Sequence, residues 1–482
     1  MATQELVVQL NPEHYDNLTD ANATGKSNFG KSSCQNNTGT VFAVGSDDNV
    51  VIYTSNSYQT KYAISISNPG NSNSKFGFKI AMDSPGDTII IGAPGDNRVY
   101  VFDAQNQART SWTQRSSGWN NNSYLGTSSS VNYGSDVDVA GDDDSLFVVG
   151  RPGDHKIELW SWPNGSSATL LKTITKSSNF GFSCKLSADG QVVIAGGPGN
   201  YYPSGSSNAY GNGIAHVYAK DPSSATTWTE RTLPFDYTDC PNVEYIDMAT
   251  TTIKDVTDIN IESGGTRTGI NPAFGFSVAI NKDGTFIAVS APNRKCFFSA
   301  EWINGTSYYK WLTGKPITGD IDEFGSFLFM QYDGTRIITG NTSVEDKVYW
   351  NAQYSRWEDV RGFTKSYCVL DWNGLYYTNY SETFNQYSFG KILTSMSKNG
   401  EFSLFSANYN NGSFIGNEAR VTGSNRTLYS GNTVFSFTRF APTIKILGTV
   451  TVGGDLKVRF LSVGGDKSYI ESDTSAGFVP GY

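Results

Sequence analysis

Short apolar stretches alternate with tight polar turns along most of this chain. Residues 274–292 give the clearest example: alternating residues up to Ile280, a turn at Lys282-Asp-Gly284, then an apolar run over 286–291. Alternation with a period of two predicts a half-buried strand, and a continuous apolar run predicts a strand covered on both faces. The Asp-Gly turn between them favours a β-hairpin, because glycine tolerates positive φ.

A Phe-Gly or Tyr-Gly pair opens each such hairpin. Successive pairs are 47, 57, 47, 94, 50 and 65 residues apart. A repeat of about 50 residues built only from strands predicts a β-propeller with one blade per repeat. We expect the glycines where backbones pack closely near the disc centre, with the aromatic rings wedged between blades. The seven pairs are Phe29-Gly30, Phe76-Gly77, Tyr133-Gly134, Phe180-Gly181, Phe274-Gly275, Phe324-Gly325 and Phe389-Gly390.

The repeats divide the chain into three parts. Residues 28–441 are expected to form an all-β, seven-bladed propeller, with an insertion at about 234–269 on one face rather than an eighth blade. Residues 1–27 are expected to be an N-terminal arm whose strand at 5–10 completes the last blade, because an open propeller would leave unpaired edges. A strand at 443–447 is the other candidate for that place. Residues 442–482 alternate between Gly-Gly-Asp corners and predict a small β tail.

Two repeats, residues 76–94 and 274–292, look like the FG-GAP repeat of integrin-α-type β-propellers. They share the Phe-Gly start, an apolar hairpin and an Ala-Pro end. The resemblance covers roughly residues 28–440, although the first, sixth and seventh repeats lack the Gly-Ala-Pro end. It implies a disc that binds its ligand on one face, and the family often carries calcium in loops of other blades.

The calcium part of that resemblance does not extend to these residues. The family's loops resemble Asp-x-Asp-x-Asp-Gly-x-x-Asp, because calcium takes about six to eight oxygen ligands. The turn at 281–284 has too few carboxylates, and Asp142-Asp-Asp144 is the only acidic cluster in such a turn. We interpret it as a solvated hairpin tip rather than an ion site, and we expect no metal and no cofactor.

Composition limits the partners. Charged residues make up 17% of the chain, against about 25% for an average globular protein, and the net charge is −9. An acidic chain without a Lys/Arg cluster argues against nucleic acid or an anionic membrane as partner. No apolar run approaches the about 20 residues of a transmembrane helix. The first ten residues lack the pattern of a signal peptide, so we expect synthesis in a cytoplasm.

Few residues suggest chemistry. The three histidines, His14, His155 and His216, have no nucleophile motif beside them, and the five cysteines are widely spaced and expected as buried free thiols. We therefore expect no enzymatic activity. Two carboxylates from separate blades, as glycoside hydrolysis needs, cannot be paired from sequence.

Tyrosines in polar loops are the candidate binding residues. Tyr201, Tyr202 and Tyr210 lie in a loop rich in Gly, Ser and Asn, and Tyr237 and Tyr245 lie in the insertion. Tyrosine among small polar residues is typical of a recognition surface. The other interpretation is that these rings pack long loops onto the disc.

These observations predict a non-enzymatic recognition or assembly module. Low charge, abundant Asn, Ser, Thr and Gly, and the Gly-Gly-Asp tail look like fibre and capsid-decoration proteins of phages and large aquatic viruses. The resemblance implies a virion structural protein, a minor capsid, vertex or fibre component made in the host cytoplasm. Its partners would be other virion proteins and host-surface glycans or proteins. The alternatives are a cell-surface or secreted glycan-binding adhesin and a propeller-based glycoside hydrolase.

Overall fold

The computed structural model describes eight longer stretches and twelve isolated strands. The stretches are residues 32–46, 48–56, 59–126, 132–199, 212–241, 272–318, 324–340 and 391–399. The strands are residues 5–8, 15–17, 244–247, 252–255, 348–351, 356–359, 367–372, 377–380, 402–407, 433–438, 444–447 and 462–463. In these parts of the chain the regular elements are β-strands and single turns of 3-10 helix.

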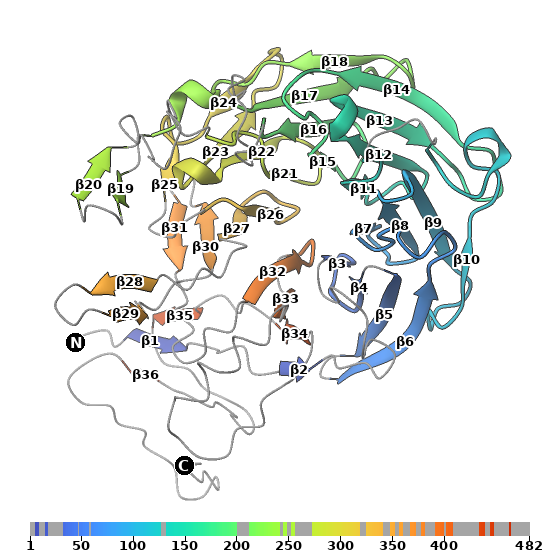
Figure 1. The fold of residues 1–482 in the computed structure, drawn as a ribbon, viewed down its shortest axis with the longest axis horizontal. Helices are drawn as coiled ribbons and strands as arrows, with labels where there is room; N and C mark the ends of the chain where they lie inside the picture. The colour runs from blue at the N-terminus through green and yellow to red at the C-terminus, as the bar shows by residue number, and fades with distance from the viewer. Residues whose placement is uncertain are drawn as a thin grey trace, which may run out of the picture.

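The repeated unit is an antiparallel sheet of four strands in chain order. In one such sheet, β7 (Lys79–Met82), β8 (Thr88–Ala93), β9 (Arg98–Ala104) and β10 (Trp112–Gln114) pair successively. Six sheets of the described chain have four strands, and a further sheet adds a short fifth strand, β25, to β23. Figure 1 shows these sheets side by side around a common axis.

The other strands occupy corresponding places. They are β3 (Ser32–Gln35), β4 (Val41–Gly45), β5 (Asn49–Asn56) and β6 (Gln59–Ser67); β11 (Val137–Val139), β12 (Leu146–Arg151), β13 (Lys156–Ser161) and β14 (Thr169–Thr175); β15 (Ser183–Leu186), β16 (Val192–Gly197), β17 (Ile214–Lys220) and β18 (Trp228–Arg231). Then follow β21 (Val278–Ile280), β22 (Phe286–Ala291), β23 (Cys296–Trp302), β24 (Tyr309–Trp311) and β25 (Ile317–Thr318); β26 (Phe327–Met330), β27 (Arg336–Gly340), β30 (Tyr367–Trp372) and β31 (Tyr377–Tyr380); and β32 (Lys391–Met396), β33 (Phe402–Ala407) and β34 (Thr433–Thr438), joined by β2 (Tyr15–Asn17).

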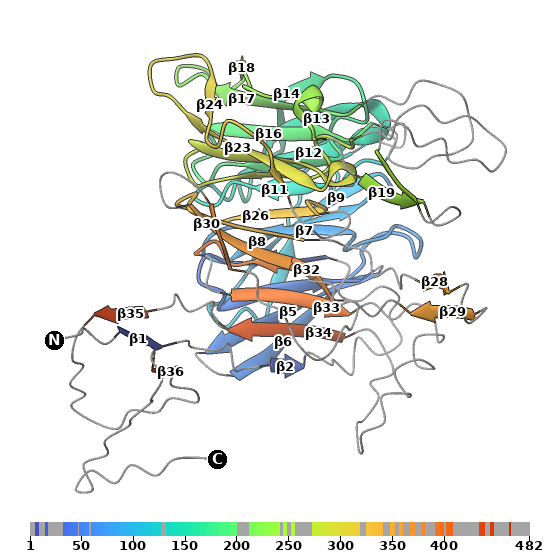
Figure 2. The ribbon, with the colours of Figure 1, turned by 90° about the vertical axis from the view of Figure 1, so that its left-hand side faces the viewer.

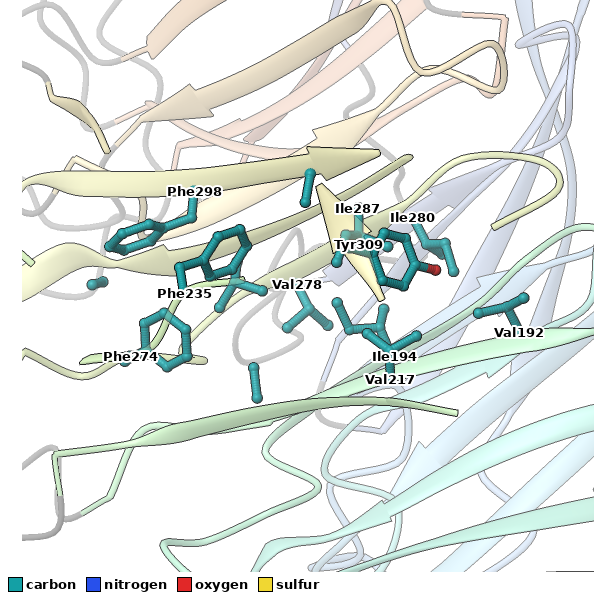
Figure 3. Close-up of a cluster of buried hydrophobic side chains, with 14 of the residues drawn as sticks. Val192, Ile194, Val217, Phe235, Phe274, Val278, Ile280, Ile287, Phe298 and Tyr309 are labelled. Carbon is teal, nitrogen blue, oxygen red and sulfur yellow. The ribbon is translucent and has the colours of Figure 1, made fainter. Parts of the chain in front are cut away.

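Apolar side chains fill the space between successive sheets. Figure 3 shows one such cluster, which contains Ile194 and Val217 from one sheet and Ile287 and Phe298 from the next. Along β16, alternate side chains pack against the two neighbouring sheets. Ile194 belongs to this cluster and Val193 to the cluster on the other side. This double coverage explains the continuous apolar runs predicted for the second strands.

The innermost strands close into a ring. They contact one another in the order β3, β7, β11, β15, β21, β26, β32 and back to β3. The last step joins residues some 360 positions apart: the Ser33 hydroxyl donates to Ser395 Oγ over 2.9 Å, and Gln35 Nε2 donates to the same oxygen over 3.1 Å. The two ends of the array therefore meet.

The hairpin turns repeat this closure with backbone hydrogen bonds. Each turn donates an amide to a carbonyl of the next turn around the axis, and the last donates to the first. The bonds are Asn37 to Ser84, Ser84 to Gly141, Asp142 to Ala188, Ala188 to Lys282, Lys282 to Tyr332, Tyr332 to Lys398 and Asn399 to Asn37, with N···O distances of 2.7–3.0 Å. Four-stranded antiparallel sheets packed around an axis, with their inner strands and turns joined in a circle, make this fold a β-propeller.

The glycines of the described Phe-Gly pairs lie where close packing was predicted. Gly77, Gly134, Gly181, Gly275 and Gly325 all have positive φ, between +81° and +99°. A Cβ on each would crowd the start of the third strand of the preceding sheet, for example the carbonyl oxygen of Ile214 at Gly275. The aromatic partners are fully buried, with at most 2% of their surface exposed. Phe29-Gly30 and Phe389-Gly390 lie outside the described residues.

The strand predicted at 5–10 does not complete the last blade. β1 (Glu5–Val8) pairs instead with β35 (Ile444–Leu447) and β36 (Ser462–Val463), so both candidates for that place pair with each other. The N-terminal strand that pairs with β34 is β2. Figure 2 shows β1, β35 and β36 to one side of the stacked sheets. The predicted tail thus contributes two strands to a small separate sheet, and its remainder lies outside the described residues.

Two hairpins lie outside the four-stranded pattern. β19 (Glu244–Asp247) pairs only with β20 (Thr252–Asp255) within the predicted insertion. β28 (Val348–Asn351) and β29 (Arg356–Asp359) form a second pair between β27 and β30. The sequence did not reveal this second hairpin, and it accounts for the longer spacing before Phe389. Among the residues that the structure describes, none lies in a helix with the length and apolarity needed to cross a lipid bilayer.

Candidate binding face and groove

Strand direction gives the disc two different faces. First strands begin, second strands end and third strands begin on one side, which also carries the Phe-Gly pairs; we call it the Phe-Gly face. The opposite side carries the turns joined in a circle, such as the turn at Ser84, and we call it the turn face. Each loop can be assigned to a face from the strands that flank it.

A groove of about 250 Å³ lies on the Phe-Gly face. Asp96 comes from the connection between β8 and β9, Arg98 is the first residue of β9, and the other residues come from the segment that follows β10. That segment is held along the start of β9 by two backbone hydrogen bonds between Val99 and Leu125, at 2.8 and 2.9 Å. The groove is lined by Asp96, Arg98, Trp119, Asn120, Asn122, Tyr124 and Gly126.

The two aromatic rings of the groove are held from behind. Trp119, in the 3-10 turn η1 (Trp119–Asn121), meets Trp160 edge-to-face with ring centroids 5.2 Å apart. Trp160 Nε1 donates to Glu158 Oε2 over 3.0 Å, and Arg151 holds the other oxygen of Glu158. This chain of contacts fixes Trp119 from the neighbouring sheet.

Charges in the groove balance. The Arg98 guanidinium lies 4.3 Å from the centroid of Tyr124 and 3.8 Å from Asp96 Oδ2. The neighbouring Tyr100 hydroxyl raises the pKa of Arg98, and a guanidinium is in any case charged at neutral pH. Asp96 also accepts from the backbone amide of Asn71 over 3.0 Å and from its side chain over 3.2 Å. A cation and an anion held in place this way fix the polar side of the groove.

Partly exposed aromatic residues also lie on the Phe-Gly face. Phe182 follows Gly181 and is 37% exposed, and its ring centroid lies 5.1 Å from that of Phe276 in the next sheet. Tyr237, in the 3-10 turn η3 (Tyr237–Asp239) after β18, is 38% exposed. Tyr308, 50% exposed, lies in the loop between β23 and β24 and so belongs to the turn face.

The sequence-predicted tyrosines are only partly described. Tyr237 lies on the Phe-Gly face, and Tyr245 lies in β19. Tyr201, Tyr202 and Tyr210 lie outside the described residues. The groove residues were missed, although Trp119-Asn-Asn-Asn-Ser-Tyr124 has the same mixture of aromatic and small polar residues as the loops that were chosen.

Two carboxylates at one innermost strand accept backbone amides of the next innermost strand. Asp136 Oδ2 accepts the backbone amide of Cys184 over 2.8 Å, and Asp138 Oδ2 accepts that of Leu186 over 2.9 Å. Lys185 lies 3.9 Å from Asp136. Asp136 directly precedes β11 and Asp138 lies in it, and both carboxylates hold the next inner strand, β15.

The acidic turn 142–144 directs its carboxylates to different partners. Asp142 pairs with Lys282 at 3.4 Å, Asp143 Oδ1 accepts from Ser145, and Asp144 Oδ2 lies 3.4 Å from Arg115 Nη2. Among the described residues, no three His, Cys, Asp or Glu side chains converge as metal ligands would.

Both described histidines have neighbours that give them structural roles. His155 Nδ1 accepts the backbone amide of Asn179 over 3.0 Å. His216 pairs with Glu230, which also binds Lys176, and burial lowers the pKa of His216. His14 lies outside the described residues.

Comparisons with known proteins found similar solved structures but no similar sequence. No protein-family model and no curated protein matches the sequence. Among solved structures, the chain is similar to the Dos1 propeller (12% identity, TM-score 0.44, covering 89% of this chain and 95% of that one). It is also similar to a protein from Lactobacillus plantarum (11% identity, TM-score 0.41, covering 75% and 96%).

Proposed function

We propose that this protein is a non-enzymatic recognition module that binds its partner with the Phe-Gly face of a seven-bladed β-propeller. The observation that carries the proposal is that two half-buried aromatic side chains, Trp119 and Tyr124, and the exposed Phe182 lie on the same face of a scaffold closed by hydrogen bonds. Exposed aromatic residues on a rigid support are typical of binding surfaces, because little conformational entropy is lost on contact.

The blade number is supported by the sheets and the ring. The first four strands of the sheet β21–β25 are arranged as in the six four-stranded sheets. The short β25 is added to them by pairing with β23. The circle of turn hydrogen bonds passes through seven turns, one from each of these sheets. On this assignment β2 supplies the outer strand of the last blade.

The absence of catalysis is part of the proposal. His155 and His216 are engaged with Asn179 and Glu230, and Asp136 and Asp138 accept backbone amides of β15. Groups used in this way are not positioned for general acid–base work.

Within this function, we place the protein in a virion, as a minor capsid, vertex or fibre component that meets other virion proteins or a host surface. The support is its composition: 17% charged residues, 50 glycines and a tail with Gly-Gly-Asp corners. Mass spectrometry of purified virus particles from the same source should detect the chain at a fixed stoichiometry. Its absence from the particles would favour the adhesin alternative.

The binding face is tested by two matched surface variants. Phe182→Ser removes an exposed aromatic ring from the Phe-Gly face, and Tyr308→Ser removes one from the turn face. Binding of the purified protein to immobilised particles or host cells should fall at least about fivefold for the first variant, since loss of a central aromatic contact costs about 1 kcal/mol or more. It should stay within about twofold for the second. Equal losses, or a loss only with Tyr308→Ser, would contradict the assignment of the face.

A further inference from the structure

We infer that the groove lined by Trp119 and Tyr124 binds a neutral saccharide, one sugar ring at a time. The inference rests on the proposed recognition function and names the ligand class of that face. It follows from the rings, the polar groups and the charge of the groove.

The rings provide an apolar wall that keeps its position. Trp119 is half-buried and braced by Trp160, while Tyr124 is half-buried and meets Tyr100 edge-to-face at 6.0 Å. A pyranose ring has an apolar face of C–H groups, which packs on an aromatic ring and is released from water when it does so. Bracing matters because a ring fixed in advance loses little entropy on binding.

The polar residues suit hydroxyl groups. Arg98 offers a planar set of donors, 32% of its side chain is exposed, and Asp96 beside it is held by Asn71. Asn120 is exposed on the rim, and Asn122 is anchored to the Trp119 carbonyl by a hydrogen bond of 2.9 Å. Neighbouring donors and acceptors in a fixed arrangement can pair with the vicinal hydroxyls of a sugar.

Charge and size favour a small neutral ligand. The seven lining residues carry one cation, Arg98, and one anion, Asp96, which lie 3.8 Å apart. An acidic ligand would have to displace Asp96 from Arg98, and a phosphate would meet that carboxylate directly. A volume of about 250 Å³ is below the ~300–1,000 Å³ of sites for drug-sized ligands, and it suits a single small ring.

The 3-10 turn of the groove provides a matched pair of variants. Asn120 and Asn121 are both exposed and both have positive φ, +54° and +63°, but only Asn120 lines the groove. Replacing either with glycine keeps the backbone conformation, because glycine adopts positive φ freely. The purified full-length protein is titrated with neutral hexoses, deoxyhexoses and N-acetylhexosamines and with uronic acids, by calorimetry and by saturation-transfer NMR.

We expect saturable binding of at least one neutral sugar. Asn120→Gly should weaken it about tenfold, as loss of a hydrogen bond to the ligand does, and Asn121→Gly should stay within about twofold. Equal effects of the two variants, binding only of uronic acids, or no binding of any sugar would overturn the inference. If no sugar binds but Phe182→Ser still reduces binding to particles or host cells, the saccharide inference fails and the recognition function stands.

Discussion

The glycine of the Phe-Gly pair shows how successive sheets pack against each other. In each described Phe-Gly pair, the glycine faces the first residue of a third strand in the preceding sheet: Asn49, Arg98, Lys156, Ile214 or Cys296. The sequence predicted close packing there, because glycine recurs beside an aromatic residue. It did not predict which backbone approaches, since that depends on the twist and spacing of two sheets.

Replacing one of these glycines should cost more than positive φ alone. Gly275 and Gly305 have similar φ, +83° and +80°, but a Cβ on Gly275 would collide with Ile214 O, while at Gly305 nothing lies within 4 Å. Gly305→Ala should lose about 1 kcal/mol of unfolding free energy from backbone strain, and Gly275→Ala at least about 3 kcal/mol. Urea denaturation of the two variants measures the difference. Equal losses would mean that the close approach is not maintained in solution.

Asp83 gives a residue-scale prediction about pH. Its Oδ1 accepts the backbone amides of Gly86, Asp87 and Thr88, and burial raises its pKa to about 6. Because the folded-state pKa lies above the unfolded value of 3.8, the stability that protonated Asp83 contributes is complete below about pH 4 and is lost as pH rises through 6.

Asp83→Asn should remove this pH dependence. Asn36 and Asn281 hold the corresponding turns in their own sheets with a neutral amide, accepting from Val41 and Phe286. At pH 7.5 the variant should be more stable than the parent by about 1–3 kcal/mol, and at pH 4 the two should be alike. Thermal unfolding at both pH values measures this. A variant less stable than the parent at pH 7.5 would show that the ionised carboxylate is the favoured acceptor.

At the scale of elements, the spacing of apolar residues and the residues of the turns predicted the positions of most strands. Which strands pair with each other is known only from the structure. The predicted apolar run 286–291 has the same bounds as β22. The strand at 5–10 was assigned to the wrong sheet, because alternation shows that a segment is a strand and not which edge it joins. Side-chain acceptors on inner edges, such as Asp138 for Leu186, also have no sequence signature.

Removing that acceptor should destabilise the ring. In Asp138→Ala, the amide of Leu186 loses its acceptor, and we expect a loss of about 1–3 kcal/mol in unfolding free energy. Asp143→Ala is the control, since Asp143 is exposed in its turn, and it should change stability by less than about 0.5 kcal/mol. Guanidinium denaturation compares them. Asp138→Ala as stable as the control would show that water replaces the carboxylate at no cost.

At the scale of the molecule, circular closure was predictable from the repeats, but the binding groove was not. A spacing near 50 residues in a chain of strands favours a closed array, because closure gives every sheet neighbours on both faces. The groove depends on the segment after β10 folding back along β9, a contact that no local pattern encodes. The one local signal is the mixture of aromatic and small polar residues at 119–124, which marks a candidate loop but not a groove.

Two N-terminal truncations should separate the closing strand from the arm. Deleting residues 1–11 removes β1 and keeps β2, while deleting residues 1–18 removes both and leaves the edge of β34 without its partner. The longer deletion should lower the melting temperature more and cause association at high concentration, because an open edge pairs with other chains. Calorimetry and light scattering measure both effects. Identical behaviour of the two deletion variants would show that β2 does not help to close the propeller.

The strand order of the small sheet of β1, β35 and β36 has a mechanical consequence. Glu5 lies opposite Leu447 and Leu6 opposite Val463, so the chain leaves this sheet toward both termini from the same end. Tension applied between the termini would peel these strands apart one rung at a time, as a zipper opens. The strands of this sheet would thus separate at a lower force than the sheets of the propeller.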